Sequence, residues 1–197
     1  MIRPRLTLLV LAAALPLAGC VSFGPKPPPS LLTISAATPL QPGTTATTDD
    51  KRAVAVALPS TPQALMTQRV MVASGPTEVA YLKDAQWAAP PAQLFRSLLA
   101  ETVTVRTGRV VPDPRLLSAQ PDTRLSGQLT RFGLDGPGRA VEVVFDAALT
   151  RSGSPTLETR RFAARVPVTA ETEGPVGTAL NQAANDVAGQ VADWIGR

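Results

Sequence analysis

The chain has a single cysteine, Cys20, which stands directly behind a short basic and apolar leader. Arg3 and Arg5 form the positive start of this leader, and residues 6–17 form its apolar middle, as in a secretory signal peptide. Spanning a bilayer takes about 20 apolar residues, so the leader is too short to be a membrane anchor by itself. We therefore expect the leader to be removed, and we expect the domain behind it to fold by packing alone, because no second thiol is present.

The end of the leader, Leu17-Ala18-Gly19-Cys20, resembles the cleavage site of a bacterial lipoprotein. In such a protein the cysteine thiol receives a diacylglycerol, the leader is cut before the cysteine, and the new amino group is acylated. The alternative is an ordinary secretory signal peptide with an incidental cysteine near its cleavage site. Because the one thiol falls at the position that the lipoprotein signal uses, we predict that Cys20 is lipidated.

The length of the chain sets the expected domain organisation. Removing residues 1–19 leaves enough chain for one domain with a substantial core, but not for two. Residues 20–30 include four prolines and should form a stiff, extended spacer. We expect a lipoprotein signal peptide over residues 1–19, a lipidated Pro-rich tether over residues 20–30 and a single α/β domain over residues 31–197.

Residue types that carry most enzymatic chemistry are scarce. The chain has no histidine, which excludes Ser-His-Asp and Cys-His catalysis and imidazole metal sites. Its carboxylate neighbours, Asp49-Asp50 and the Glu171/Glu173 pair, fall in expected loops, where such groups are usually solvated. We therefore expect no catalytic residue, no metal and no cofactor, apart from the covalent diacylglycerol and N-acyl chain on Cys20, and we predict that the protein is not an enzyme.

Nucleic acid is also a poor candidate partner. The chain has 19 basic and 15 acidic side chains, and two of the arginines lie in the leader. Its longest basic runs have two residues, and aromatic residues make up only 4% of the chain. A nucleic-acid-binding surface would need clustered cations, with aromatic residues among them for single strands.

Hydrophobic periodicity predicts a series of strands, a helix, further strands and a second helix. The first helix lies between Pro91 and Gly108, and the second covers residues 175–195. The predicted strands cover residues 31–35, 53–58, 69–72, 77–82, 109–111, 125–134, 140–150 and 156–168, and residues 36–51 form an exposed loop. Because strict alternation of strand and helix is absent, we predict an α/β (α+β) fold, a mostly antiparallel sheet with two helices packed on one face.

The predicted strand at residues 140–150 alternates most clearly. Its apolar residues share one face, while Glu142 and Asp146 point the other way, as in a sheet that is covered on one side and solvated on the other. In the next strand, Arg160, Arg161 and Arg165 are expected to lie opposite these carboxylates. We interpret these charges as cross-strand pairs on a solvated sheet face.

Trp87, just before the first predicted helix, has two interpretations. The favoured one is a core anchor that caps the start of the helix. The other is an exposed contact for a partner, because tryptophan is enriched at binding hot spots. Trp87 is therefore our one candidate partner contact.

Several segments, taken in order, resemble a known family. They are the lipoprotein signal, Leu31-Leu32-Thr33-Ile34, Val54-Ala55-Val56 leading into Leu58-Pro59, the run at residues 65–72, and most specifically Tyr81-Leu82-Lys83-Asp84-Ala85-Gln86-Trp87-Ala88-Ala89-Pro90-Pro91 before the first helix. In this order they resemble the ABC-type transport auxiliary lipoproteins that accompany MCE-domain lipid transporters of Gram-negative bacteria, including the Pqi type. The resemblance covers about residues 31–195, and the loop at residues 36–51 is longer than it requires.

The resemblance implies an α/β domain on the periplasmic face of the outer membrane, held there by its lipid anchor. It implies an accessory role in phospholipid or hydrophobic-molecule transport beside an MCE-domain subunit, and it carries no catalytic residues. Val21, which follows the lipidated cysteine, is similar to an outer-membrane sorting signal, since an aspartate there retains enterobacterial lipoproteins in the inner membrane.

Two further possibilities stay open at the level of sequence. The protein could itself carry a lipid or another apolar ligand in a groove between the helices and the sheet, where the alanine-rich face of the last helix could leave room. Homo-oligomerisation is also open, because nothing in the residue pattern decides it.

Overall fold

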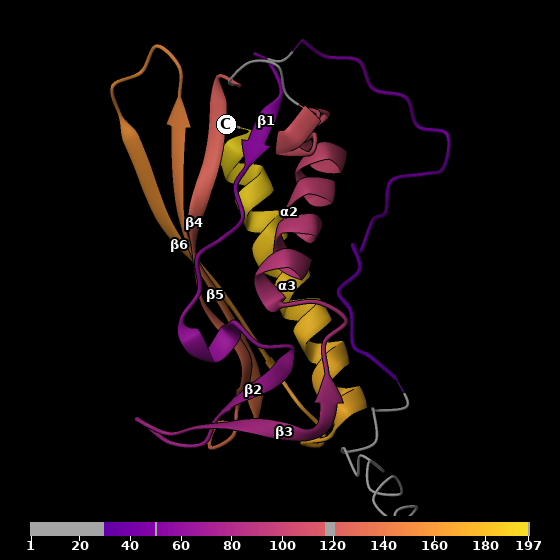
Figure 1. The fold of residues 1–197 in the computed structure, drawn as a ribbon, viewed down its shortest axis with the longest axis vertical. Helices are drawn as coiled ribbons and strands as arrows, with labels where there is room; N and C mark the ends of the chain where they lie inside the picture. The colour runs from indigo at the N-terminus through magenta and orange to yellow at the C-terminus, as the bar shows by residue number, and fades with distance from the viewer. Residues whose placement is uncertain (1–29, 50, 117–120, 197) are drawn as a thin grey trace, which may run out of the picture.

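The computed structural model describes residues 30–49, 51–116 and 121–196. Cys20, the leader and nearly all of the tether lie outside the described residues. The described chain forms two layers, a six-stranded sheet and a pair of helices that cover one of its faces (Figure 1). This arrangement confirms the predicted fold class.

Three long antiparallel strands form the main part of the sheet. They are β4 (Thr123–Asp135), β5 (Ala140–Arg151) and β6 (Leu157–Pro167), and β5 lies between the other two. The predicted alternation of β5 is confirmed, because the apolar residues of one face are buried beneath the helices. They are Val141, Val143, Phe145, Ala147 and Leu149.

Two shorter strands share the other edge of β4. β1 (Val54–Val56) pairs in parallel with its first residues, and β2 (Arg69–Ala73) pairs in parallel with its last. β3 (Val79–Gln86) then adds to β2 as an antiparallel hairpin partner, as predicted. Gly133 is required where β2 meets β4, because a Cβ there would overlap the carbonyl oxygen of Met71. The sheet is therefore antiparallel except where β1 and β2 pair with β4.

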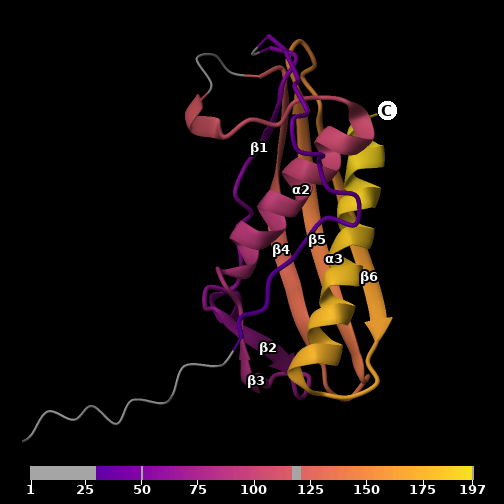
Figure 2. The same ribbon diagram turned by 90° about the vertical axis from the view of Figure 1, so that its right-hand side faces the viewer.

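Both helices lie close to their predicted positions. α2 (Pro91–Thr107) starts with a proline, which needs no hydrogen-bonded N–H there, and ends at Gly108 in the left-handed conformation, with a φ of 68°. α3 (Glu173–Ile195) lies beside α2 on the sheet (Figure 2). Its alanine face is fully buried, which explains how a helix backbone approaches the sheet so closely.

Aromatic pairs join the two layers. The Phe95 ring of α2 lies 5.3 Å from the Phe145 ring of β5, in an edge-to-face arrangement. At the end of the molecule that carries β3, the Trp87 ring lies 5.4 Å from the Phe132 ring of β4. On the other side of the core, Phe162 of β6 packs against Trp194 of α3.

Two predicted strands are wrong. In residues 31–35, only Leu32 forms a β-bridge, to Trp87, and the backbone beyond it is bound by side chains of the helices instead of by another strand. Residues 109–111 are irregular, although the Val110 carbonyl accepts one hydrogen bond from the Val54 N–H at 2.9 Å. The exposed loop predicted over residues 36–51 is confirmed within the described residues.

Candidate interaction surface

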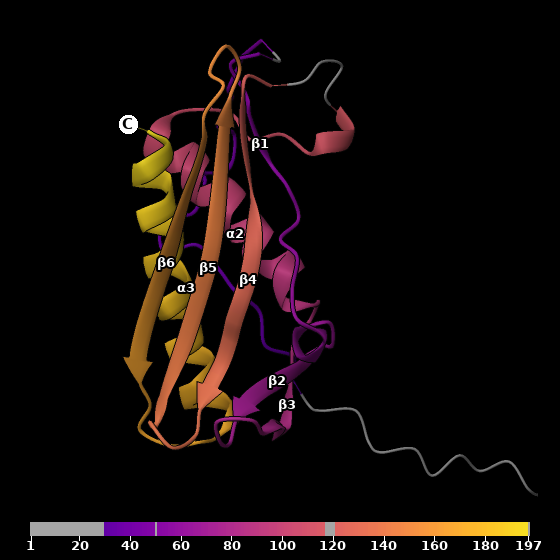
Figure 3. The same cartoon turned by 90° about the vertical axis from the view of Figure 1, so that its left-hand side faces the viewer.

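The sheet has one broad face that no helix covers. Figure 3 looks onto this side of β4, β5 and β6, with α2 and α3 behind the sheet. We call it the outer face, and it is formed by the residues that alternate with the buried ones along the three strands. They are Arg124, Ser126, Gln128, Arg131, Gly133, Asp135, Glu142, Val144, Asp146, Ala148, Thr150, Leu157, Thr159, Arg161, Ala163 and Arg165.

The strongest pair on the outer face joins Arg161 and Asp146, which lie opposite each other on β6 and β5. The guanidinium donates its Nε proton to Oδ1 at 2.6 Å and an Nη2 proton to Oδ2 at 2.8 Å. This bidentate geometry favours the charged forms of both groups. This hydrogen bond lowers the pKa of Asp146 and raises that of Arg161. The predicted cross-strand pair of these two residues is confirmed.

The other charges of the outer face are arranged differently from the prediction. Glu142 accepts a hydrogen bond from Arg131 of β4 at 3.1 Å. Arg165 lies opposite Glu142 in the register but forms its ion pair with Asp135 at 2.7 Å, and its hydrogen bond lowers the pKa of Asp135. The prediction for Arg160 is wrong, because adjacent residues of a strand point to opposite faces.

Arg160 lies on the helix-covered side of β6. Its guanidinium carbon stands 5.1 Å from the centre of the Phe162 ring, a cation–π distance. The outer face therefore carries only two of the three arginines predicted from β6.

Small side chains occupy the middle of the outer face. Val144 and Ala163 lie between the ion pairs, Ala148 lies on the other side of Asp146, and Val144 is almost fully covered by its neighbours. A shallow hollow of about 360 Å³ runs over Ala148 and Thr159 beside the Arg161 pair. The combination of a flat, weakly polar centre and charged surroundings suits contact with another protein better than enclosure of a small molecule.

Trp87 is a core residue. Its side chain is 0% exposed and packs against Phe132 beneath the bridge from Leu32. The core-anchor interpretation is confirmed, and the candidate partner contact at Trp87 is wrong, because no part of the ring reaches the surface. Among the described residues, its Nε1 is the only buried side-chain polar atom without a hydrogen-bond partner.

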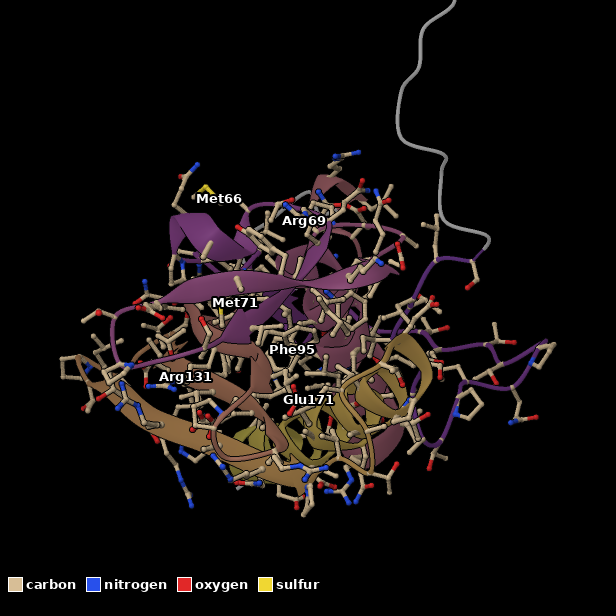
Figure 4. The ribbon with its side chains drawn as sticks, turned by 90° about the horizontal axis from the view of Figure 1, so that it is seen from below. Met66, Arg69, Met71, Phe95, Arg131 and Glu171 are labelled. Atoms are coloured by element: carbon tan, nitrogen blue, oxygen red, sulfur yellow. The ribbon has the colours of Figure 1, made fainter. Side chains whose placement is uncertain are left out.

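Tyr81, which belongs to the segment at residues 81–91, makes two contacts that were not predicted from the sequence. Tyr81 donates its hydroxyl proton to the carbonyl of Ala64 at 3.3 Å, and Arg69 stacks over its ring at 4.4 Å. The hydrogen bond joins the β2–β3 hairpin to the loop that follows β1, and the stacking joins the two strands of the hairpin. Met66 of this loop is 58% exposed, and it lies with Arg69 at the periphery of the molecule when viewed from this end (Figure 4).

The described residues assemble no group of three or more metal-ligating side chains. Asp49 is hydrogen-bonded by Arg52 within its own loop, and that contact lowers the pKa of Asp49. Glu173 accepts a hydrogen bond from the Ser30 hydroxyl at 3.0 Å, and Glu171 is exposed. Within the same part of the chain, no helix has the length and apolar character needed to cross a bilayer.

The groove for an apolar ligand that the sequence left open has no counterpart along the alanine face of α3. Ala183, Ala184, Ala188 and Ala192 are all fully buried by close packing. A hollow of about 650 Å³ does lie along α3, but it is open and has a polar lining that includes the ion pair of Arg106 and Asp193. Such a lining does not suit a lipid chain.

Comparison with known proteins identifies the fold and the family. A model of the family described as "ABC-type transport auxiliary lipoprotein component" matches residues 33–192, most of the chain. The chain belongs to this family. It is therefore an auxiliary lipoprotein component of ABC-type transport, and the resemblance inferred from the sequence is confirmed. Among curated proteins, none matches the chain.

Two solved structures share the fold of this auxiliary lipoprotein. One is protein XCC0632 from Xanthomonas campestris, of the family DUF330, with a TM-score of 0.64 and 22% identity over 84% of this chain and 92% of that one. The other is described as an uncharacterized protein, with a TM-score of 0.64 and 20% identity over 77% of this chain and 96% of that one. At these identities the likeness establishes the fold alone. Lipidation of Cys20, which precedes both the family match and the described residues, stays a prediction.

Proposed function

We propose that this auxiliary lipoprotein is a non-enzymatic docking component of an intermembrane phospholipid transporter of the ABC type with an MCE-domain subunit. The observation that carries the proposal is the family match over residues 33–192, which covers nearly all of the described domain. In this proposal the acyl chains on Cys20 hold the protein in the outer membrane, with the domain in the periplasm. Each buried methylene contributes about 0.8 kcal/mol, so several acyl chains anchor durably where one would be marginal.

The entry point of the tether supports this arrangement. Ser30 is hydrogen-bonded to Glu173 at the start of α3, so the tether joins the domain at that end. Ten extended residues would place this end within about 30 Å of the bilayer. The turn between β5 and β6 lies at the opposite end of the molecule (Figure 1), so the long strands lead away from the point of attachment.

The outer face is the surface that we assign to the transporter subunit. The helix layer is overlaid by residues 31–40, whereas β4, β5 and β6 have no cover on their other side (Figure 3). The outer face has small side chains near its centre, Val144 of β5 with Ala163 beside it on β6, and ion pairs on both sides of them. A centre with few large or charged groups, surrounded by polar residues, is typical of a protein interface.

Co-purification with the MCE-domain protein encoded nearby tests the proposal. The lipoprotein would be isolated after mild crosslinking from cells that make the transporter, and we expect the MCE-domain protein to be recovered with it. Ala163→Arg places a long charged side chain on the outer face beside Val144 and should abolish this recovery. Gln182→Arg, on the exposed side of α3, is the matched control and should leave it intact.

Recovery of the wild-type lipoprotein alone would contradict the docking role. Equal recovery with both variants would instead contradict the assignment of the outer face. Circular dichroism of the purified variants would establish that each one is folded.

A further inference from the structure

The first described residues lie as an extended segment on the helices, and two asparagines of α3 hold its backbone. Asn185 accepts a hydrogen bond from the Ala37 N–H at 2.7 Å and donates one to the Ser35 carbonyl at 2.9 Å. Asn181 accepts a hydrogen bond from the Ser35 N–H at 2.9 Å. We call residues 31–48 the strap. Figures 1 and 2 show it running along α2 and α3, from the end that carries β3 to the end where β1 starts.

The remaining contacts of the strap are few. Leu32 forms the bridge to Trp87, through hydrogen bonds to Gln86 and from Ala88. Further along, the Leu40 N–H donates to Glu101 of α2 at 2.8 Å. The next part of the strap is exposed, and the hydrogen bonds of its described residues are local, such as that from Thr44 to Gln41.

The strap contributes little to the core of the domain. Every fully buried hydrophobic residue of the described chain lies at Ala53 or beyond, and the strap contributes only the partly buried Leu32, Ile34 and Ala36. Hydrogen bonds at exposed sites, between side chains and backbone, each stabilise only weakly because water competes for the same groups. Elements held in this way open locally well before the core unfolds.

We propose that the strap is a releasable extension of the tether, which lets the domain change both its distance from the membrane and its orientation. With the strap bound, the chain leaves the domain beside the start of α3. With the strap released, it leaves beside β1, where Val54 is bound to Val110 just after α2, at the opposite end of the domain. Eighteen extended residues add roughly 60 Å of reach. This inference rests on the proposed lipid anchor for the distance from the membrane, whereas release of the strap from the helices does not depend on it.

Hydrogen exchange of the full lipidated chain in detergent micelles tests the release. Mass spectrometry would follow peptides from residues 31–40 and from β5. We expect the strap to exchange roughly 100-fold faster than β5 or more, because its opening leaves the core intact. Asn185→Ala removes two hydrogen bonds to the strap and should raise strap exchange about 10-fold or more without changing β5. Gln182→Ala on the same helix is the matched control.

Two glycines of α3 supply a second test that does not depend on the asparagines. A Cβ at Gly177 would lie 2.7 Å from the Leu32 side chain, whereas a Cβ at Gly174 would meet nothing within 4 Å. Both positions lie in α3, where alanine favours the helix over glycine. Gly177→Ala should therefore push the Leu32 side chain away from α3, weaken the attachment of the strap there and speed strap exchange, while Gly174→Ala should not.

The distance of the domain from the membrane would be measured by neutron reflectivity of the lipidated protein on a supported bilayer. The layer of Gly177→Ala should extend further from the membrane than that of Gly174→Ala. Equal exchange rates in the strap and β5 would overturn the proposal, as would variants that change both segments together or equal layer heights for the two glycine variants. None of these measurements includes a transporter, so a negative result would leave the docking role untouched.

Discussion

From the sequence, Trp87 could be either a core residue or a contact for a partner. Replacing it distinguishes these two roles. Truncation of a fully buried tryptophan to alanine costs about 4 kcal/mol, including its contact with Phe132 at 5.4 Å. For a domain of this size, each kcal/mol moves the melting temperature by about 3 °C, so Trp87→Ala should lower it by about 12 °C. Trp87→Phe keeps an aromatic ring and removes the unpaired Nε1 proton, so we expect a much smaller change.

Thermal unfolding followed by circular dichroism measures these shifts. Met66→Ala serves as the control, because an exposed side chain should contribute less than about 0.5 kcal/mol. The co-purification assay, run well below all melting temperatures, supplies the second readout. If Trp87→Ala melted within about 2 °C of the wild type and still lost the transporter subunit, the argument from burial would be refuted.

Three further predictions follow from the described contacts and the lipoprotein signal. Cys20→Ser should leave the domain folded but move the protein from the membrane to the soluble fraction and abolish its function, as cell fractionation and a complementation assay would show; a fully functional soluble variant would contradict the need for a tether. Because Arg161 lowers the pKa of Asp146, their pairing stabilises the fold above the ordinary aspartate pKa of about 3.9 and is lost as the pH falls through the lower folded value. Asp146→Asn should therefore flatten the acid side of the stability-versus-pH curve, and an unchanged curve would show that the pair contributes nothing. Gly133→Ala should separate β2 from β4 by collision with Met71 and lower the melting temperature by several degrees, and normal melting would show that the strands adjust.

The elements that the sequence predicted well are those whose burial is regular. β5 alternates along most of its length, and α2 has a proline at its start and a glycine at its end, so local chemistry decides each of them. The segment at residues 31–35 also alternates, since Leu32 and Ile34 are partly buried between exposed neighbours. Alternation shows that one side of an extended segment is buried, but not what covers it. Here α3 covers it, and the asparagines that bind it lie about 150 residues away, beyond the reach of local patterns.

The sequence predicted ion pairs across the strands of the outer face, but it did not predict every partner. The pairing of Arg161 with Asp146 follows from the order of two neighbouring strands. Arg160 and Arg161 are adjacent, so strand geometry alone excludes placing both on one face. The partners of Glu142 and Arg165 depend on β4 and on the turn after it, whose register includes an irregularity between Leu129 and Arg131. No sequence pattern marked that irregularity.

The shared edge of β4 has a consequence for the order in which the chain folds. β1 and β2 are made first, yet their parallel partner begins only at Thr123, after the whole of α2. Pairing across such a sequence separation is slow, because the intervening chain must be ordered before the contact forms. β4, β5 and β6 can meet through short turns, so we expect this meander to assemble first and then to serve as the template on which β1 and β2 are laid. If the chain crosses a membrane amino terminus first, as the proposed lipoprotein signal implies, β1 and one edge of β2 would thus stay unpaired until the last third of the chain has arrived.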